Sequence, residues 1–413
     1  MKAEIIAVGS EMLTPDYLDT NSLFITERLN QAGCEVHLKT VVGDDRSDMV
    51  ALIRQALRRS DLVILSGGLG PTEDDLTRAA VAEVLNRAIT VDSSLVEGLR
   101  RRFASRGYQM PEINERQAQV IEGASVLDNP FGTAPGMWLE EDGTGIALLP
   151  GPPRELKPML ERYVIPRVLE RSGGRRLASS HFHITGMTES EVDSRVAPVY
   201  RTYPGIRTII LAKPGHIALR ISRWVEPGEL SADLEELVSR IQALLGDAVF
   251  SLAQESLEEV VGRMLLESGR TLALAESCTS GMIGARITRV PGSSRYFLGG
   301  IMCYSNEVKK HLCGVPDGVI EEHGAVSAET AEALALGVRD RLGSSTALSV
   351  TGIAGPEGGS IEKPVGLVFV GLSDECRAIH LKRIIPGDRE TIRERATYFA
   401  LSSLRRFLLS GNS

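Results

Sequence analysis

Short apolar runs rich in β-branched residues alternate with amphipathic helical segments, and this alternation most constrains the fold. Near the N-terminus, the runs EIIAV (4–8), CEVHLKTVV (34–42) and DLVILS (61–66) are typical of strands. Residues 21–33 and 49–60, between them, repeat apolar side chains at helical spacing. Strands separated by helices of this length predict βαβ units, in which a parallel sheet carries helices on both faces. Ligands of such sheets bind at the carboxyl ends of the strands.

The alternation resumes after Leu252, with an expected helix over 257–268, the strand TLALA and a closing helix over 388–409. Between the two blocks, the polar stretch ERSGGRRLASS indicates a linker, and the segment after it predicts a small α+β module. A chain of 413 residues is long enough for about two to four domains. We therefore expect an α/β protein with three domains, at residues 1–170, 176–252 and 253–413.

Charge and cysteine usage narrow the class of partner and the compartment. The net charge is −8 and no run of Lys or Arg occurs, which disfavours nucleic acid or an anionic membrane as the main partner. The five cysteines show no CxxC pair, a pattern typical of reduced thiols in a cytoplasmic protein. No apolar window is long enough to span a bilayer. A small ligand is the expected partner.

The expected strand DLVILS leads directly into GGLGPTEDDLT, residues 67–77. Its glycines would let backbone amides approach a phosphate, whereas Asp74 and Asp75 would repel that phosphate unless a cation lay between them. Asp44 and Glu11 follow neighbouring strands, so these acidic corners are expected to converge on a nucleotide bound through a divalent metal. The alternative is a tight βα turn whose acids stabilise a helix N-terminus.

The stretch LALAESCTSGMIG, residues 272–284, places hydroxyls and a thiol where a strand runs into a helix. Ser and Thr there could simply cap the helix. They could instead include a nucleophile, for which Ser277 is the natural candidate. Cys278 competes for that role, but no histidine is placed to act as its partner, so a buried small residue is the favoured interpretation of Cys278.

The motifs of both blocks resemble one known family. VGSEML, LDTNS, VVGDD, GGLGPTEDDLT, NPFGTAPGM and LPGPPRELK are similar to the N-terminal domain of the CinA family, whose fold resembles that of molybdopterin-adenylating proteins. AESCTSG, VPGSSRYFLGG, CYSNEVKKHLCGV, EEHGAVSAETA, VTGIAGPEGGS and EKPVGLVFV are similar to its C-terminal nicotinamide-nucleotide amidase domain. One departure is that Ser280 replaces the family's usual glycine, which would place a side chain near the pocket.

For the C-terminal domain, the resemblance implies hydrolysis of nicotinamide mononucleotide to nicotinic acid mononucleotide and ammonia, without a cofactor. It carries the nucleophile role to Ser277. Lys309 would be the base, because a lysine desolvated by the core can lose its proton near neutral pH. Tyr304 would relay a proton or hold the lysine. The expected substrate-binding residues are Thr279, Gly281, Asn306, Gly352, Ala354 and Gly355.

For the N-terminal domain, the resemblance implies an ADP-ribose pyrophosphatase that uses Mg, Mn or Co. The expected metal ligands are Glu11, Asp44 and Asp75. The expected nucleotide-binding residues are Gly67, Gly68, Gly70, Thr72, Asn129, Pro150 and Gly151. Two alternatives stay open: this domain binds or adenylates a molybdopterin, or the chain is a non-enzymatic, nucleotide-responsive partner of the competence or DNA-repair machinery.

The middle segment resembles the small KH-like module of the family. Its turn LAKPGH lacks the GxxG loop that clamps a nucleic-acid backbone, so RNA binding is not expected. We expect this module to act as a spacer and to support a homodimer, which the resemblance also implies.

Overall fold

The computed structural model describes residues 1–229 and 231–410, which form two compact units. The first unit comprises Met1–Ala178 and Trp224–Ser231, and the second comprises Ser179–Arg223 and Ala232–Ser413. Positions 411–413, at the end of the expected C-terminal domain, lie outside the described residues. None of the helices in the described part of the chain combines the length and apolar character that crossing a membrane requires.

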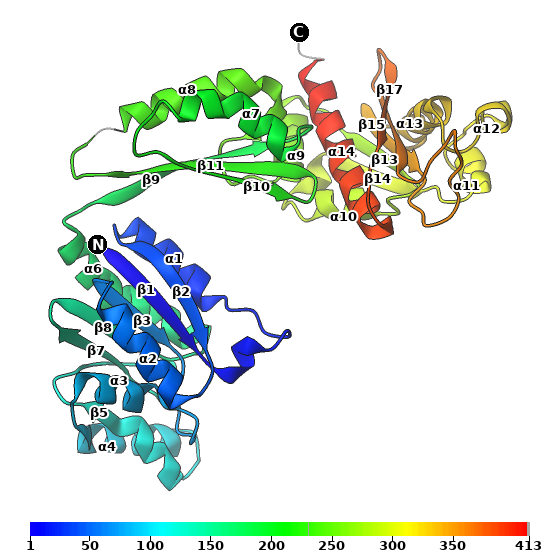
Figure 1. Ribbon diagram of the computed structural model, residues 1–413. Helices are drawn as coiled ribbons and strands as arrows, with labels where there is room; N and C mark the ends of the chain where they lie inside the picture. The colour runs from blue at the N-terminus through cyan, green and yellow to red at the C-terminus, as the bar shows by residue number, and fades with distance from the viewer. Residues whose placement is uncertain (230, 411–413) are drawn as a thin grey trace. The chain divides into compact units, whose positions relative to one another are not determined.

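The first unit is built on a six-stranded sheet with the strand order β2-β1-β3-β8-β7-β6 (Figure 1). Its strands are β1 (Lys2–Val8), β2 (Glu35–Val42), β3 (Leu62–Ser66), β6 (Ser125–Leu127), β7 (Gly136–Glu141) and β8 (Thr144–Leu149), with β4 (Ile89–Val91) and β5 (Gln119–Ile121) forming a separate pair. Its helices are η1 (Ser10–Leu13), α1 (Asn21–Gln31), α2 (Arg46–Leu57), α3 (Thr77–Leu85), α4 (Ser93–Ser105), η2 (Glu112–Ala118), α5 (Pro153–Met159), η3 (Leu160–Val164) and α6 (Ile165–Ser172).

Helices cover both faces of this sheet, as the alternating pattern predicts. Apolar side chains of α1, α5 and α6 pack with one face of β1, β3 and β8, and those of α2 and α3 pack with the other face. Strands β1, β2, β3 and β8 are parallel, so their carboxyl ends lie at one edge of the sheet. This edge carries the loops that follow Val8, Val42, Ser66 and Leu149.

The sheet of the first unit is mixed: the expected parallel arrangement holds for β1, β2, β3 and β8 but not for β6 and β7. β7 pairs antiparallel with β8, and β6 pairs antiparallel with β7. The turn between β7 and β8 is the dipeptide Asp142–Gly143, whose residues both have positive φ, 47° and 83°. A two-residue turn can join only antiparallel strands, since a parallel pair needs a long crossover.

The second unit contains a four-stranded sheet, β10-β11-β9-β12, and a five-stranded sheet, β14-β13-β15-β16-β17. The strands are β9 (Arg176–Ile184), β10 (Arg207–Lys213), β11 (His216–Val225), β12 (Val249–Ser251), β13 (Leu272–Glu276), β14 (Phe297–Met302), β15 (Thr346–Gly352), β16 (Leu367–Ser373) and β17 (Ala378–Ile384). The helices are α7 (Glu189–Tyr200), α8 (Ala232–Leu245), η4 (Gly246–Ala248), α9 (Leu257–Glu267), α10 (Met282–Thr288), η5 (Ser293–Arg295), α11 (Asn306–His311), α12 (Asp317–His323), α13 (Ala328–Leu342) and α14 (Arg389–Leu409).

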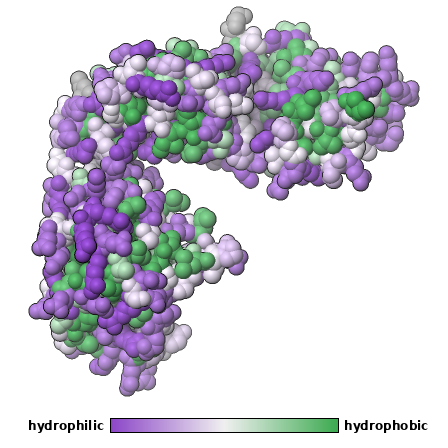
Figure 2. All heavy atoms as spheres, in the orientation of Figure 1, coloured by the Kyte–Doolittle hydropathy of each residue, from purple (hydrophilic) through white to green (hydrophobic). Residues whose placement is uncertain are grey.

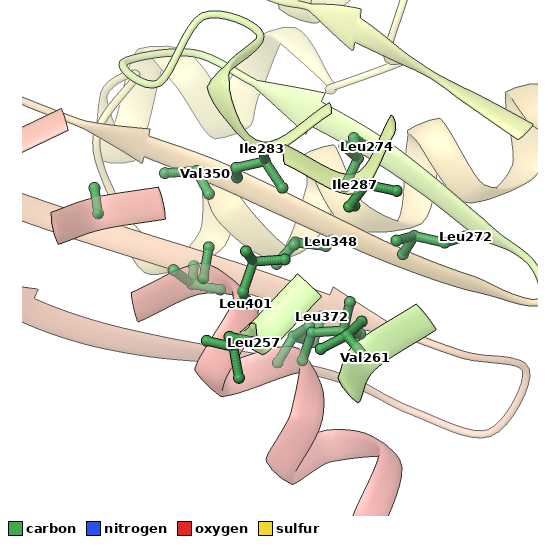
Figure 3. Packing of buried hydrophobic residues seen from close by; sticks show 14 of the residues in the cluster. Leu257, Val261, Leu272, Leu274, Ile283, Ile287, Leu348, Val350, Leu372 and Leu401 are labelled. Carbon is green, nitrogen blue, oxygen red and sulfur yellow. The ribbon is translucent and has the colours of Figure 1, made fainter. Parts of the chain in front are cut away.

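The five-stranded sheet is also mixed. β13 is parallel to β14 and β15, whereas β16 and β17 continue as antiparallel strands. Its main core joins side chains of α9, α10 and α14 to one face of the sheet, among them Leu257, Leu274 and Leu401 (Figure 3). The ends of β13 and β15 therefore hold Ser277 and Gly352 over a rigid core.

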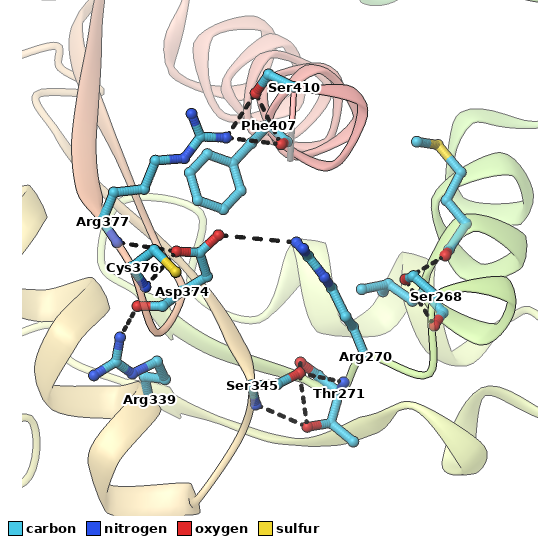
Figure 4. Close-up of polar contacts among 12 residues, drawn as sticks. Ser268, Arg270, Thr271, Arg339, Ser345, Asp374, Cys376, Arg377, Phe407 and Ser410 are labelled. Atoms are coloured by element: carbon cyan, nitrogen blue, oxygen red, sulfur yellow. Dashed lines mark hydrogen bonds and ion pairs between the residues drawn. The ribbon is translucent and has the colours of Figure 1, made fainter. Parts of the chain in front are cut away.

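The end of α14 is anchored to the sheet by polar contacts. Arg377 Nη2 donates to Ser410 Oγ at 2.7 Å and to the Phe407 carbonyl at 3.2 Å (Figure 4). Arg270 forms an ion pair of 3.9 Å with Asp374, the residue that follows β16.

Hydrophilic side chains dominate the visible surface around smaller hydrophobic patches (Figure 2).

Candidate functional site

Ser277 lies directly after β13, where the chain turns into the segment leading to α10. Its amide donates to the Val350 carbonyl of β15 at 2.9 Å, and the Cys303 amide donates to the Glu276 carbonyl at 2.8 Å. These two bonds extend the pairing of β13 with both neighbours to its last residues. The segments that follow the three strands, including Ser277 and Tyr304, therefore start side by side.

The N-terminus of α10 is held by a carboxylate rather than by the hydroxyls of the corner. Glu276 is 3 % exposed, and its two oxygens accept the amides of Gly281, Ile283 and Gly284 at 2.9, 3.1 and 2.9 Å. The Thr279 hydroxyl donates to the same carboxylate at 2.8 Å. Helix capping by serine was one explanation of this stretch, but Glu276 performs that role.

The Ser277 hydroxyl makes no hydrogen bond to the described residues, and the side chain is 7 % exposed. A serine that is nearly buried and does not act as a cap is available to a substrate at the end of the strand. This placement is compatible with the nucleophile role predicted for Ser277.

Lys309 is carried on α11 and is 2 % exposed. Its Nζ donates to the Tyr304 carbonyl at 3.2 Å, which is its one recorded hydrogen bond within the described chain. Burial lowers the pKa of Lys309, although the neighbouring thiols of Cys303, Cys313 and Cys278 act in the opposite direction. A buried ammonium with one acceptor loses its proton more readily than an exposed one, which is what a catalytic base requires.

Cys278 has a different environment from Ser277. It belongs to the apolar core between β13 and α14, and burial raises the pKa of its thiol to about 12. A thiol with such a pKa is almost wholly protonated near neutral pH and is a poor nucleophile. Its burial agrees with the interpretation of Cys278 as a small core residue.

Two arginines of α14 hold the corner, and the sequence analysis missed both. Arg393 donates to the carbonyls of Cys278 and Thr279 at 3.0 and 3.2 Å. Arg389 donates to the Gly355 carbonyl at 2.6 Å and to the Tyr304 hydroxyl at 3.0 Å. Spacing along the chain could not reveal them, because Arg393 lies 115 residues from Cys278.

The residues expected to bind substrate divide into two groups. Gly281, Gly352 and Gly355 lie in the segments around Ser277, and Asn306 is exposed at the start of α11. Thr279, by contrast, is 0 % exposed, and its hydroxyl is used by Glu276. Ala354 is 6 % exposed and belongs to the core. Direct contact of the Thr279 side chain with a substrate is therefore not supported.

Ser280 adopts a left-handed backbone conformation, with φ of 48°. Its side chain is exposed, so it does not fill the corner behind Ser277. Glycine adopts this conformation without steric cost, which explains physically why a glycine would suit this position.

In the first unit, the strand-end loops surround a cavity of about 440 Å³. Glu11, Asp44, Asp74 and Asp75 line it together, as the sequence analysis expected for the acidic corners. The other predicted residues that line the cavity are Gly67, Gly68, Gly70, Pro150 and Gly151. The carboxyl edge of the sheet thus carries a concave, acidic site.

The glycine loop fits closely against its surroundings. A Cβ on Gly67 would lie 2.2 Å from the Val8 carbonyl, and a Cβ on Gly68 would lie 2.2 Å from the Thr77 hydroxyl. Arg78 is 3 % exposed and donates to the carbonyls of Leu69 and Gly70, both at 3.0 Å. Burial lowers the pKa of Arg78 to about 10. Sequence analysis missed Arg78 as the residue that shapes this loop.

Asp75 ties the loop together. Its carboxylate accepts the Gly70 amide at 2.6 Å, the Thr72 amide at 2.8 Å and the Thr72 hydroxyl at 2.5 Å. Thr72 does not line the cavity. Part of the capacity of Asp75 to bind a cation is therefore already used inside the loop, and the Thr72 hydroxyl is turned to Asp75.

Asn129 supports the wall of the site rather than lining it. Its side chain is 4 % exposed, donates to the Ala134 carbonyl and Glu155, and accepts the amides of Phe131 and Gly132. These bonds occupy the amide group of Asn129, so direct contact with a nucleotide is not supported.

The carboxylates that line the cavity of the first unit could hold a divalent metal only together with other ligands. Within residues 1–229 and 231–410, no three His, Cys, Asp or Glu side chains gather closely enough to hold an ion by themselves. Mg²⁺ usually binds through one or two carboxylates and completes its shell with water and substrate phosphates. One or two of the carboxylates Glu11, Asp44 and Asp74, which line the cavity, would suffice for that mode, in which a metal enters with a phosphate ligand.

Comparison with known proteins agrees with this organisation. Residues 254–408 match the CinA C-terminal domain, and residues 4–170 match the Probable molybdopterin binding domain. A CinA-like protein of Solibacter usitatus is 48% identical over 98% of this chain and 98% of its own length. A CinA-like protein of Koribacter versatilis is 46% identical over 99% of this chain and 100% of its own.

A solved structure is similar to part of the chain. The competence damage-inducible protein A of Klebsiella pneumoniae is 29% identical, with a TM-score of 0.36 over 37% of this chain and 95% of that protein. On the full-length similarity to the two CinA-like proteins and the match of its C-terminal domain, this chain belongs to the CinA family, with an N-terminal domain of the molybdopterin-binding type.

Proposed function

We propose that the second unit hydrolyses the carboxamide of nicotinamide mononucleotide, giving nicotinic acid mononucleotide and ammonia. One observation carries this proposal: Glu276 takes the backbone amides at the start of α10, so that the nearly buried Ser277 hydroxyl stays unengaged. Lys309, desolvated on the neighbouring segment, supplies the complementary base.

In the proposed reaction, Ser277 Oγ attacks the carboxamide carbon while its proton passes to Lys309 Nζ. The tetrahedral intermediate then collapses, the C–N bond breaks and ammonia leaves with the proton from Lys309. Water next attacks the acyl-serine and gives one proton to Lys309, which passes it to Ser277 Oγ as the ester C–O bond breaks. This restores Ser277 and the neutral lysine and releases nicotinic acid mononucleotide. Arg393 and Arg389 keep the two reacting segments in place through the carbonyls and hydroxyl that they bind.

The test is ammonia release from nicotinamide mononucleotide by the wild type, Ser277→Ala and Cys278→Ala. Ser277→Ala should lose at least roughly a thousandfold in kcat, because the covalent route is removed. Cys278→Ala should keep most of its activity and lose thermal stability through the core cavity it creates. Equal activity of Ser277→Ala and the wild type would exclude the serine mechanism, and inactivity of the wild type would exclude this substrate.

For the first unit, we propose a metal-dependent ADP-ribose pyrophosphatase that yields AMP and ribose 5-phosphate. The support is the acidic cavity of about 440 Å³, which Glu11, Asp44 and Asp74 line together with the glycines of the loop after β3. A divalent metal, when bound, would polarise a phosphoryl oxygen and help to ionise water. The loop glycines let main-chain groups approach the diphosphate, and Asp44 would orient the metal-bearing substrate.

The test is AMP release from ADP-ribose with Mg²⁺, Mn²⁺ or Co²⁺, and its loss in Asp44→Asn.

The match to the Probable molybdopterin binding domain favours a second candidate for this unit, which is binding or adenylation of a molybdopterin. A pterin that binds more tightly than ADP-ribose in a titration would select that candidate, and the reverse order would dismiss it.

We also propose that the chain acts as a cytoplasmic homodimer. Exposed apolar side chains lie beside the Ser277 corner, where Met302 is 63% and Tyr304 is 61% exposed. Light scattering at micromolar concentration should give the dimer mass, and a monomer would contradict this.

The alternative to both enzymatic proposals is a non-enzymatic role in competence or DNA repair. This alternative predicts that Ser277→Ala leaves the cellular phenotype unchanged.

A further inference from the structure

A second cavity lies within the second unit, away from the Ser277 corner. Its volume is about 520 Å³, within the range of small-molecule sites. Residues that follow β9, the turn between β10 and β11, and the strand β17 form its walls. None of the residues proposed for the amidase reaction lines it. We refer to it as the α14 cavity, after the helix that supplies its floor.

One face of α14 supplies that floor. The helix residues that line the cavity are spaced by three and four positions, which places their side chains along a single stripe. They are Arg395, Tyr398, Phe399, Ser402, Ser403 and Arg406. The stripe mixes two cations, two aromatic rings and two serine hydroxyls, a composition suited to a polar ligand rather than to a purely apolar one.

Two turns that lie against this stripe carry glycines of positive φ. Gly186 has φ of 78°, and a Cβ there would lie 2.3 Å from Arg406 Nη2. Gly215 also has φ of 78°, and a Cβ there would lie 2.1 Å from the Tyr398 ring. The cavity is therefore bounded by close-packed contacts and is not a gap left by loose packing.

Positively charged side chains outnumber carboxylates in the lining of the α14 cavity. One carboxylate, Glu189, lines it, against five cations: Lys213, Lys382, Arg383, Arg395 and Arg406. The Lys382 ammonium lies over the Phe369 ring at 5.7 Å, on the α13 side of the sheet, so the other four cations are the ones left to contact a ligand. None of the five is in an ion pair with the described residues. Arg383 lies over the Phe399 ring at 5.6 Å and is near enough to Glu191 to lower the pKa of that carboxyl, whereas Arg395 donates to the Pro386 carbonyl at 3.2 Å.

Such a cluster is unexpected in this chain. The net charge is −8, so carboxylates are in excess and are available to pair with cations. Cations that converge without carboxylates repel one another, and an anion placed among them would relieve that repulsion. His216, also in the lining, adds a buried Nδ1 that makes no hydrogen bond of ordinary geometry to described residues.

We infer that the α14 cavity binds a small molecule carrying a phosphate or diphosphate group. Guanidinium groups match the geometry of phosphate oxygens, and several cations together match a charge of two or more. The inference does not depend on the amidase proposal, since the two sites share no residue. Inorganic pyrophosphate and a nucleotide both carry such a group, and the experiment below distinguishes between them.

The experiment is calorimetric titration of the full chain with pyrophosphate, and separately with AMP, in EDTA and low salt. The test variant is Lys213→Gln with Arg383→Gln, two exposed cations of the cavity. The matched control is Arg201→Gln with Arg289→Gln, which removes the same charge from exposed positions of the same unit outside the cavity.

The wild type, the control and Ser277→Ala should bind pyrophosphate with equal affinity, and the cavity variant should bind at least about tenfold more weakly. Sodium chloride should weaken the wild-type interaction. If AMP binding is weakened in the same variant, the ligand is a nucleotide, and if only pyrophosphate binding is weakened, it is an inorganic diphosphate. Absence of binding by the wild type at millimolar concentration, or equal binding by cavity variant and control, would overturn the inference.

Discussion

Two strand-to-helix corners of this protein look alike in sequence but are organised differently. After β3, Asp75 accepts amides of its own loop and lies at the surface of an open, acidic cavity. After β13, Glu276 accepts the amides at the start of α10 and is 3 % exposed. The first carboxylate organises a glycine loop that borders the cavity, whereas the second holds the start of α10 and leaves the Ser277 hydroxyl without a hydrogen bond to the described residues. Carboxylates beside glycine turns therefore differ in what they stabilise, a surface loop in one case and a buried helix N-terminus in the other.

The largest expected effect tests whether the Ser277 corner is built for chemistry. Lys309→Met should lower the rate of ammonia release roughly a thousandfold, because the buried base is lost while a similar apolar stem is kept. Lys310→Met is the matched control, since Lys310 is paired with Asp317 at 2.7 Å. If both variants keep wild-type activity, the buried lysine has no catalytic part.

The pH dependence of ammonia release also tests whether Lys309 acts as the base. Burial lowers the pKa of Lys309, so the neutral base becomes available below the ordinary lysine pKa of 10.5. kcat/KM should rise as pH increases through this lowered pKa. Because the folded pKa lies below the unfolded one, the stability of the unit should also rise with pH across that interval. A rate that is flat or falls over this range would contradict the assignment of Lys309 as base.

Glu276→Gln should destabilise the second unit by about 3 kcal/mol, because a charged acceptor of several amides becomes a neutral group with one donor facing them. Trp138 lies in β7 of the first unit, whereas Trp224 lies in β11, so the urea unfolding is followed in a Trp224→Phe background, where tryptophan fluorescence reports on the first unit alone. The circular dichroism transition should therefore shift while the fluorescence transition stays. Glu259→Gln, an exposed capping glutamate on α9, is the control and should cost less than about 1 kcal/mol.

Asp75→Asn should destabilise the first unit instead of the second, and by less than Glu276→Gln does. The half-buried carboxylate would lose part of its bonding to Thr72, at a cost of about 1 kcal/mol. The fluorescence transition should move to lower urea, with no change in ammonia release. If Asp75→Asn also abolishes AMP release as fully as Asp44→Asn does, Asp75 serves the reaction itself and not only the loop.

Sequence patterns predicted the strand ends that carry both sites, because hydrophobic periodicity is a local property. They also predicted that Glu11, Asp44 and Asp75 would share one edge, which follows from parallel strands. They could not reveal Arg393 or the buried state of Thr279, because those depend on how α14 and the corner pack over a long sequence separation. The antiparallel strands β6 and β7 were missed because the crossover pattern was extended past the Asp142–Gly143 turn.

The smallest expected effect concerns the backbone of the Ser277 corner. Ser280→Gly removes the steric cost of the left-handed φ of 48° but increases the freedom of the unfolded chain, so the net gain should be about 0.5 kcal/mol. Ser294→Gly, an exposed position of η5, should instead destabilise the protein, because no positive φ is relieved there. Opposite shifts of the circular dichroism midpoint would show that strain resides in the corner. A loss of stability in both variants would mean that Ser280 is accommodated without strain, and the corner would owe its rigidity to the Glu276 contacts alone.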